Sequence, residues 1–474
     1  MDKEKVLITT AIDYVNDVIH LGHAYQKMLA DCVVRYERLK RGKDKALYVT
    51  GTDEHGQKVY KIAQEKGEEI KEYVDKIAKR DQEQQDALNI SYDRFIRTTD
   101  EDHIKFASQF TQKVYDNGYI YKDTYKGLYC SGCEAYKTEK DLEDGKCPLH
   151  PNLEIEEMEE ENYFFKLSEF KGFLKEHFDK HPNFVLPPQR FKEMYMFLDD
   201  LQDIPITRRK EILPWGIEAP FDKDHVLWVW FDALVNYLTF GHQNNFWDEN
   251  TKIIHFLGKD NARMHAVLWP AMLEAAGEYV LPTTIYVNAF LSIDGKKISK
   301  SLGNIIRPAD LVEKYGTDPV RYYFLRYGPI VEDTDYNQSH FEQVYTADLA
   351  NGLGNTAARL TKLAQKSGFE FPIENIKDSV WEEDWAKPFE ECRVDIAAQN
   401  IWSRLADLDK HINDNEPWAV EDKDKLKNIL TYEINELRII NEIIKPFIPQ
   451  TSDKISASIN KEKITFSDSL FPRL

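Results

Sequence analysis

The sequence predicts an α/β fold in which a doubly wound parallel sheet is split by an insertion and followed by an all-α helical bundle. Three observations support this prediction. Apolar, β-branched runs alternate with helical periodicity in residues 1–118 and again in residues 226–309, as in strand–helix repeats that build a parallel sheet. Between these segments, residues 119–225 break the pattern and contain clustered cysteines. In residues 346–474 only helical periodicity remains.

The first half of the sheet contains three predicted strands, at residues 6–12, 46–50 and 94–97. Helices are predicted at residues 28–42 and 69–89 and, after a cap at Thr99 or Asp100, up to residue 117. The first strand is apolar and β-branched throughout, which is typical of a strand buried on both faces. Right-handed crossovers between such strands produce a Rossmann-like sheet.

The second half of the sheet resumes after the insertion. Strands are predicted at residues 226–231, 253–257 and 285–288, with a helix at residues 263–276. Trp230 and Tyr237 fall near a strand-to-helix junction, where aromatic side chains either pack in the core or form a pocket wall. From residue 310 to 345 we expect a mixed connecting segment in which the strands have stopped.

The C-terminal helices show one apolar face each, because their apolar residues recur at intervals of three and four. These positions are Ile401, Leu405, Leu408 and Ile412 in one helix, and Ile434, Leu437, Ile440 or Asn441, and Ile444 in another. Pro417 should end a helix and leave Trp418 as a stacking platform for a base. The alternative is a tryptophan that covers the end of the bundle core.

A turn with the sequence His20-Leu21-Gly22-His23 joins the first strand to the first helix. The free backbone N–H groups of a helix start favour anions. Gly22 has no side chain, so a phosphate or a planar ring could approach the backbone. Imidazoles can donate hydrogen bonds to developing negative charge. A capped, buried turn without such a role is the alternative.

A second polar motif is Gly295-Lys296-Lys297-Ile298-Ser299-Lys300-Ser301, which places three lysines on one loop. A lysine-rich loop is usually a solvated surface feature. About 270 residues separate it from the His20 turn. Each motif alone is weak evidence for a functional site, and the two together are stronger evidence.

Four residues within the insertion have the spacing of a zinc site. Cys130 and Cys133 form one Cys-x-x-Cys pair, and Cys147 and His150 follow as Cys-x-x-His. This spacing suits tetrahedral zinc. Four protein ligands leave no open position, so we expect one structural zinc per chain. Unrelated thiol and imidazole groups are the alternative.

The composition is that of a large enzyme of a reducing compartment. The chain has 474 residues, 42% of them hydrophobic, and five cysteines. No apolar run reaches the roughly 18 residues of a membrane span, and the N-terminus lacks a signal-peptide pattern, so a cytoplasmic protein is expected. The net charge of −20 argues against a general nucleic-acid binder, although a local basic track remains compatible with one.

The two polar motifs together resemble the HIGH and KMSKS signatures of class I aminoacyl-tRNA synthetases. Within that class the chain is similar to the methionyl-tRNA synthetase family over essentially its whole length. Five further features carry this resemblance: the cysteine–histidine knuckle, residues 51–56, residues 229–233, residues 258–260 with His265, and Asn413 with Pro417 and Trp418.

The resemblance implies roles for individual residues. The catalytic residues would be His20, His23, Lys297 and Lys300. The ATP site would add Gly22 and Ser299. The methionine pocket would be lined by Ile12, Tyr14, Asp53, Trp230, Ala233, Leu234, Tyr237 and His265. The anticodon would be bound by Asn355, Arg359 and Trp418.

The resemblance also implies the activity. Methionine would react with ATP, accompanied by Mg²⁺, to form methionyl-adenylate, and the methionyl group would pass to the terminal adenosine of tRNA(Met). No covalent protein nucleophile is needed. The long C-terminal extension that dimerises some relatives is absent from the sequence, so a monomer is expected. Asn261 stands where the family usually has an aliphatic pocket residue, so the pocket is either more polar or Asn261 turns away.

Three alternatives remain on the sequence alone. Another class I synthetase is one, but the valine, isoleucine and leucine enzymes carry a much larger editing insertion, and a cysteine enzyme would lack the Pro417-Trp418 element. A catalytically inactive tRNA-binding or scaffold protein is the second, and the intact histidines and lysines argue against it. A nucleotidyltransferase for a small metabolite is the third, and the helical C-terminal third argues against it.

Overall fold

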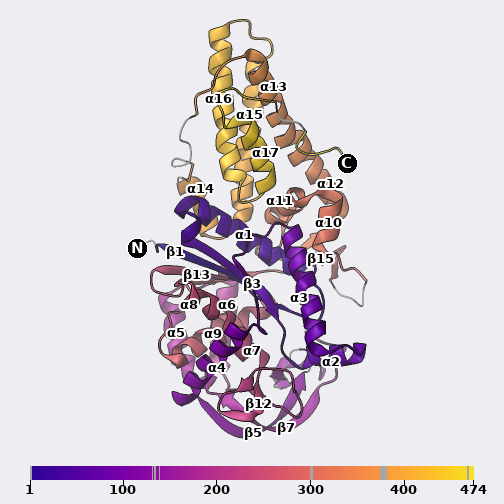
Figure 1. Cartoon of the computed structure of the whole chain (residues 1–474), viewed down its shortest axis with the longest axis vertical. Coiled ribbons are helices and arrows are strands. Elements are labelled where there is room, and N and C mark those ends of the chain that lie inside the picture. Colours follow the sequence, from indigo (N-terminus) through magenta and orange to yellow (C-terminus); the bar gives the residue numbers. More distant parts are fainter. Residues whose placement is uncertain are drawn as a thin grey trace. The chain divides into compact units, whose positions relative to one another are not determined.

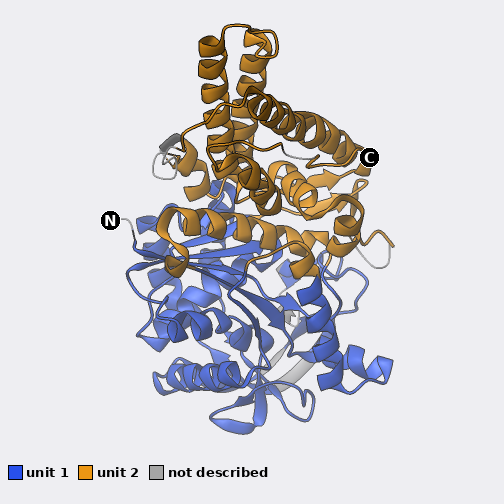
Figure 2. Cartoon of the chain, turned by 45° about the horizontal axis from the view of Figure 1, so that its top comes forward, with its two compact units in different colours: residues 1–19, 47–83, 92–287 blue, residues 20–46, 84–91, 288–474 orange. Residues whose placement is uncertain are grey.

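The structure is a computed structural model that describes residues 3–130, 132, 135–137, 139–298, 303–373, 380–381, 383–466 and 469–474. Three expected site residues, Cys133, Ser299 and Lys300, lie outside these ranges. The chain divides into two compact units, which Figure 2 shows in blue and orange. Unit 1 comprises residues 1–19, 47–83 and 92–287, and unit 2 comprises residues 20–46, 84–91 and 288–474.

Unit 1 contains a parallel, Rossmann-like sheet with the order β2-β3-β1-β13-β14-β8, in which β4 also pairs with β3. Its strands are β1 (Lys5–Thr10), β2 (Asp13–Tyr14), β3 (Ala46–Asp53), β4 (Arg94–Arg97), β8 (Val185–Leu186), β13 (Thr251–Gly258) and β14 (Thr284–Asn288). Strand β1 pairs in parallel with β13, and β3 with β2 and β4. Val6, Leu7 and Ile8 are fully buried, which confirms the prediction of a strand covered on both faces.

The helices of unit 1 contribute to a large apolar cluster and, through α2 and α3, to a second, smaller one. They are α2 (Gln57–Lys66), α3 (Ile70–Ala87), α4 (Glu101–Asp116), α5 (Lys171–Lys180), α6 (Pro188–Phe197), α7 (Val229–Ala233), α8 (Asn236–Gln243), a π-helix (Met264–Leu268) and α9 (Trp269–Ala276). Asp100 precedes α4 as predicted, but its side chain makes no capping hydrogen bond there. Its carboxylate instead accepts from Arg94 and from the backbone of Arg97.

Residues 119–225 form mainly antiparallel structure. One sheet has the order β6-β5-β7-β9, and a second has the order β10-β12-β11. The strands are β5 (Ile120–Cys130), β6 (Ala135–Lys137), β7 (Glu156–Phe165), β9 (Ile204–Pro205), β10 (Thr207–Arg209), β11 (Glu218–Ala219) and β12 (Asp222–Leu227). Strand β8 also lies in this segment, yet it pairs in parallel with β14 of the main sheet.

The predicted parallel strand at residues 226–231 is wrong. Strand β12 ends at Leu227 and pairs antiparallel with β10 and β11, and Trp228 is the N-cap of helix α7, which begins at Val229. A short, continuously apolar run does not distinguish a buried strand from a buried helix, because neither period appears in it. Trp230 therefore lies on a helix.

Unit 2 contains helix α1 (Leu21–Arg41), which ends at Gly42 as predicted, and a small sheet with the order β16-β15-β17. The strands are β15 (Leu291–Ile293), β16 (Lys296–Lys297) and β17 (Thr334–Tyr336). Because β17 pairs in parallel with β15, the prediction that strands stop at residue 310 is wrong. Helices α10 (Pro308–Tyr315) and α11 (Thr317–Tyr327) connect β16 to β17.

The rest of unit 2 is helical, as predicted. It contains α12 (Gln338–Val344), a π-helix (Tyr345–Gly354), α13 (Asn355–Ser367), α14 (Glu383–Glu390), α15 (Val394–Asn415), α16 (Lys423–Ile444) and α17 (Pro449–Ile459). Helices α13, α15 and α17 pack against α16 (Figure 1). The predicted apolar faces of α15 and α16 are buried in this bundle. Among the helices that the structure describes, none has the length and apolar character needed to cross a bilayer.

Candidate functional site

The His20 turn is a doubly capped helix start in unit 2. His20 is the N-cap of α1, and its Nδ1 accepts a hydrogen bond from the backbone N–H of Gly22 at 3.1 Å. The Nδ1 of His23 accepts from the backbone N–H of His20 at 3.3 Å, and the two ring centroids are 4.0 Å apart. A neutral imidazole that accepts at Nδ1 carries its proton on Nε2. The turn therefore presents two Nε2–H donors at a helix N-terminus, where anions are favoured.

The lysine motif begins on a hairpin of the same unit. Asp294 and Gly295 have φ angles of 50° and 70°, so β15 and β16 are joined by a tight turn. One carboxylate oxygen of Asp335 accepts from Ser292 Oγ and from the backbone N–H of Gly295, both at 2.7 Å. This bond pair fixes the hairpin that carries the exposed Lys297.

Gly22 and Ile298 bring the two motifs side by side. A Cβ atom on Gly22 would lie 2.9 Å from Cε1 of His20 and 3.7 Å from Cδ1 of Ile298. The first of these distances shows that a side chain at position 22 would displace the capping ring of His20. The second shows that the start of the lysine loop packs against the histidine turn within unit 2.

The expected methionine residues lie together in unit 1. Tyr237 donates from its hydroxyl to Nε2 of His265 at 2.7 Å, and Nδ1–H of His265 donates to the backbone oxygen of Asn261 at 3.0 Å. The ring of Trp230 meets that of His265 edge to face, with centroids 6.2 Å apart. Burial lowers the pKa of His265 to about 4, so its ring is neutral. Asn261 thus contacts His265 through its backbone carbonyl.

Two further expected methionine-site residues lie at the ends of β2 and β3. Tyr14 and Asp53 are register partners there, and Asp53 is only 7% exposed. Burial, together with the charges of Asp53 and Asp13, raises the pKa of the Tyr237 hydroxyl. The Asp53 carboxylate therefore acts electrostatically on the aromatic group. Two other expected pocket residues, Ala233 and Leu234, are buried, and Ile12 packs at the rim of the same apolar cluster.

Sequence reasoning missed three features around this pocket. His265 lies in a π-helix, a rare form often found at functional sites, and no sequence pattern indicates it. The buried Glu54 carboxylate accepts from Arg97 Nε at 2.6 Å and Nη2 at 2.8 Å, and Trp215 donates to the Glu54 carbonyl. His55 pairs with Asp232. The polar motif at residues 51–56 was the available signal for the last two.

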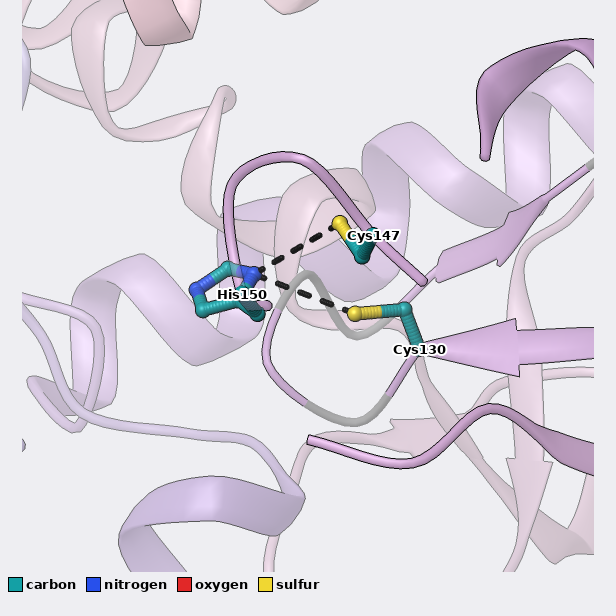
Figure 3. A group of neighbouring side chains, drawn as sticks. All are labelled: Cys130, Cys147 and His150. Carbon is teal, nitrogen blue, oxygen red and sulfur yellow. Dashed lines mark hydrogen bonds between the residues drawn. The ribbon is translucent and has the colours of Figure 1, made fainter. Parts of the chain in front are cut away.

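Three of the four expected zinc ligands converge in unit 1. Figure 3 shows His150 Nδ1 facing both sulfurs, at 3.8 Å from Cys130 and 3.9 Å from Cys147. Their ligand atoms all lie within 4.8 Å of one another. Zinc–sulfur and zinc–nitrogen bonds of about 2.3 and 2.0 Å place these atoms about 3.5 Å apart in a tetrahedron. A Cβ on Gly132 would lie 2.4 Å from the His150 ring, so glycine is required there. The described residues fit a zinc ion.

The expected anticodon residues lie in the bundle of unit 2. Arg359 donates to Asp409 at 3.1 Å and to Asn413 at 3.0 Å, and its Cζ lies 5.4 Å from the centroid of Trp418. Trp418 is 52% exposed, so the alternative of a core tryptophan is wrong. Helix α15 ends at Asn415, just before Pro417, as predicted. Asn355 is exposed at the start of α13.

Comparison with known proteins agrees with this geometry. A family model described as "tRNA synthetases class I (M)" matches residues 6–157 and 140–361. The methionine–tRNA ligase of Clostridium acetobutylicum is 37% identical over 98% of this chain and 75% of its own length. That of a Nostoc species is 38% identical over 94% of this chain and 88% of its own.

Solved structures are similar along the whole chain. Mycobacterium tuberculosis methionyl-tRNA synthetase in complex with methionyl-adenylate has a TM-score of 0.89 and 32% identity, covering 99% of this chain and 100% of that chain. Its apo form has a TM-score of 0.80 and 29% identity, covering 100% and 98%. The fold and the matched family model define the class, the class I tRNA synthetases. With relatives of this identity over nearly its full length, the chain belongs to the methionyl-tRNA synthetase family.

Proposed function

We propose that this chain is a methionine–tRNA ligase of protein biosynthesis. It activates methionine with ATP and transfers the methionyl group to the 3′-terminal adenosine of tRNA(Met). The observation that carries the proposal is the grouping of Trp230, Tyr237 and His265 with the nearly buried Asp53. A thioether is polarizable and favours aromatic edges, and a carboxylate can pair the substrate ammonium.

In the first step, a carboxylate oxygen of methionine attacks the α-phosphorus of ATP, and the bond to pyrophosphate breaks. Catalysis is positioning and electrostatic stabilisation. His20 and His23 donate to the phosphates at the helix start, with Gly22 allowing close approach. Lys297 and Lys300 bind the phosphates as charge develops, together with Ser299. Mg²⁺ would accompany ATP as its counter-ion.

In the second step, a ribose hydroxyl of the terminal adenosine attacks the activated carbonyl of methionyl-adenylate. The bond to AMP breaks and AMP leaves. Asp53, Ile12 and Tyr14 hold the amino-acid end during both steps, and Ala233 and Leu234 complete the wall behind the side chain. Asn355, Arg359 and Trp418 bind the anticodon, with the exposed indole stacking on a base.

We further infer five segments: a catalytic first half (1–118), a zinc-binding insertion (119–225), a catalytic second half (226–309), a connecting segment (310–345) and an anticodon-binding bundle (346–474). Cys130, Cys133, Cys147 and His150 would hold one zinc ion that stabilises the insertion and takes no part in the reaction. The protein would act as a monomer in the cytoplasm, where tRNA is charged.

The test is amino-acid-dependent exchange of pyrophosphate into ATP, measured with each of the twenty amino acids. We expect exchange with methionine alone, followed by charging of tRNA(Met). Lys300→Ala should slow adenylate formation roughly a hundredfold with little change in methionine binding, because the lysine acts mainly in the transition state. If no amino acid supported exchange, the proposed ligase activity would be rejected. If a different amino acid supported exchange, methionine would be rejected as the substrate.

A further inference from the structure

His55 and Asp232 form a buried pair beside the proposed methionine pocket. Nδ1 of His55 lies 2.8 Å from a carboxylate oxygen of Asp232. The side chains are 5% and 0% exposed. A carboxylate accepts hydrogen bonds, so Nδ1–H of His55 is the donor. Burial raises the pKa of the Asp232 carboxyl, and the contact with His55 acts in the opposite direction.

The pair joins two chain segments that carry the two sides of the pocket. His55 lies two residues after Asp53 at the end of β3, and Asp232 lies on α7 between Trp230 and Ala233. These segments are 177 residues apart in sequence. Helix α7 has only five residues, so its own backbone hydrogen bonds do little to hold its orientation.

The surroundings of the pair support a positional role. The other carboxylate oxygen of Asp232 is buried and has no hydrogen-bond partner among the residues that the structure describes. The His55 ring meets the Trp215 ring at 5.5 Å, and Trp215 donates to the carbonyl of Glu54. Burial lowers the pKa of the fully buried His103 to about 3. His103 is therefore neutral near pH 7.

We propose that His55 is a positioning residue for the methionine site, which holds the Asp53 segment against α7 through Asp232. This inference rests on the proposed function. The His55–Asp232 hydrogen bond fixes the distance between the Asp53 carboxylate and helix α7. In the proposed site, Asp53 pairs with the substrate ammonium and α7 contacts the substrate thioether. Small misplacements of such groups lower affinity and rate substantially. None of these residues is among those proposed to bind ATP.

Two substitutions of His55 separate this role from simple structural support. In His55→Asn the amide nitrogen occupies nearly the place of Nδ1 and keeps the donor, whereas in His55→Gln the amide lies nearer the place of Nε2. In methionine-dependent pyrophosphate exchange, His55→Gln should raise the KM for methionine about tenfold with the KM for ATP unchanged. His55→Asn should stay within about threefold of the wild type.

A double-mutant cycle tests the partner. Asp232→Ala should raise the KM for methionine as His55→Gln does. The double variant should have a KM for methionine no higher than that of the more impaired single variant. His225→Gln is the matched control, because His225 is an equally buried histidine of unit 1 that lies 3.2 Å from Asp222. It should leave the KM for methionine unchanged.

Equal KM values for His55→Asn and His55→Gln, or additive effects in the cycle, would overturn the inference while the wild type still exchanges with methionine. A wild-type protein without methionine-dependent exchange would instead reject the proposed function. Thermal melting of every variant accompanies the kinetics. A lower Tm with an unchanged KM for methionine would assign the pair to stability alone and would also overturn the inference.

Discussion

The guanidinium of Arg359 lies over the ring of Trp418, with its Cζ 5.4 Å from the ring centroid. Asp409 and Asn413 hold the same guanidinium through hydrogen bonds of 3.1 and 3.0 Å. The indole is thus supported by a cation that is itself fixed, while half of its surface remains exposed. An exposed, oriented ring is what base stacking requires.

Trp418→Ala should weaken tRNA binding by about 1–3 kcal/mol, the usual contribution of one base–aromatic stack. Methionine-dependent pyrophosphate exchange without tRNA should stay near wild type. Tyr432→Ala is the control, since Tyr432 is 51% exposed on the same bundle and is not among the expected anticodon residues. If Trp418→Ala melted at a lower temperature and lost both tRNA binding and pyrophosphate exchange, Trp418 would be a structural residue instead.

Tyr237→Phe should raise the KM for methionine several-fold and leave the KM for ATP unchanged. The substitution removes the donor to Nε2 of His265 and leaves a buried acceptor unpaired, at a cost of about 1–3 kcal/mol. Tyr73→Phe is the control, because it removes another buried phenol hydroxyl of unit 1, which donates to the backbone of Asn16. If both variants raised the KM for methionine equally, the assignment of Tyr237 to the methionine site would be contradicted.

Acid should destabilise unit 1 through its buried histidines. Burial lowers the pKa of His265 to about 4 and that of His103 to about 3, from an ordinary value of 6.5. Below about pH 6.5 these histidines therefore bind protons in the unfolded chain but stay neutral in the folded chain. As a result, the free energy of unfolding falls as pH drops from 6.5 toward 4. Each histidine contributes about 1.4 kcal/mol per pH unit in that window. Urea unfolding of His103→Gln should show a shallower pH slope, and an unchanged slope would refute this.

Purified protein should contain one zinc per chain. Cys147→Ser should lose the metal and loosen residues 119–225 more than the parallel sheet, because metal binding is coupled to local folding. Elemental analysis and hydrogen exchange measure the two effects. Cys392→Ser, which changes a buried cysteine of unit 2, should keep the metal. A metal-free protein with normal melting and activity would contradict the zinc assignment.

Asp335→Ala should slow adenylate formation about tenfold and leave methionine affinity intact, because it releases the hairpin that carries Lys297. Both hydrogen bonds go to the same carboxylate oxygen, so Asp335→Asn keeps an acceptor and should be much less affected. Single-turnover adenylation measures the rate. Equal rates for the two variants would show that the hairpin needs no such anchor.

The local features of this protein can be predicted from its sequence alone. The buried first strand, the end of the first helix at Gly42 and the apolar faces of α15 and α16 follow from periodicity and capping. The cysteine–histidine spacing indicated the convergence of Cys147 and His150, because ligands three residues apart meet in one turn of chain. These features depend on neighbours within a few residues.

The pairings between distant segments depend on the tertiary fold. Nothing local indicates that Tyr237 donates to His265, that His55 meets Asp232, or that β8 joins the parallel sheet. The strand predicted at residues 226–231 failed for the same reason, since its uniform apolar run leaves the choice of helix or strand to the surrounding packing. Burial depends on which surfaces meet in three dimensions, so the neutral state of His265 also emerges only in the folded chain.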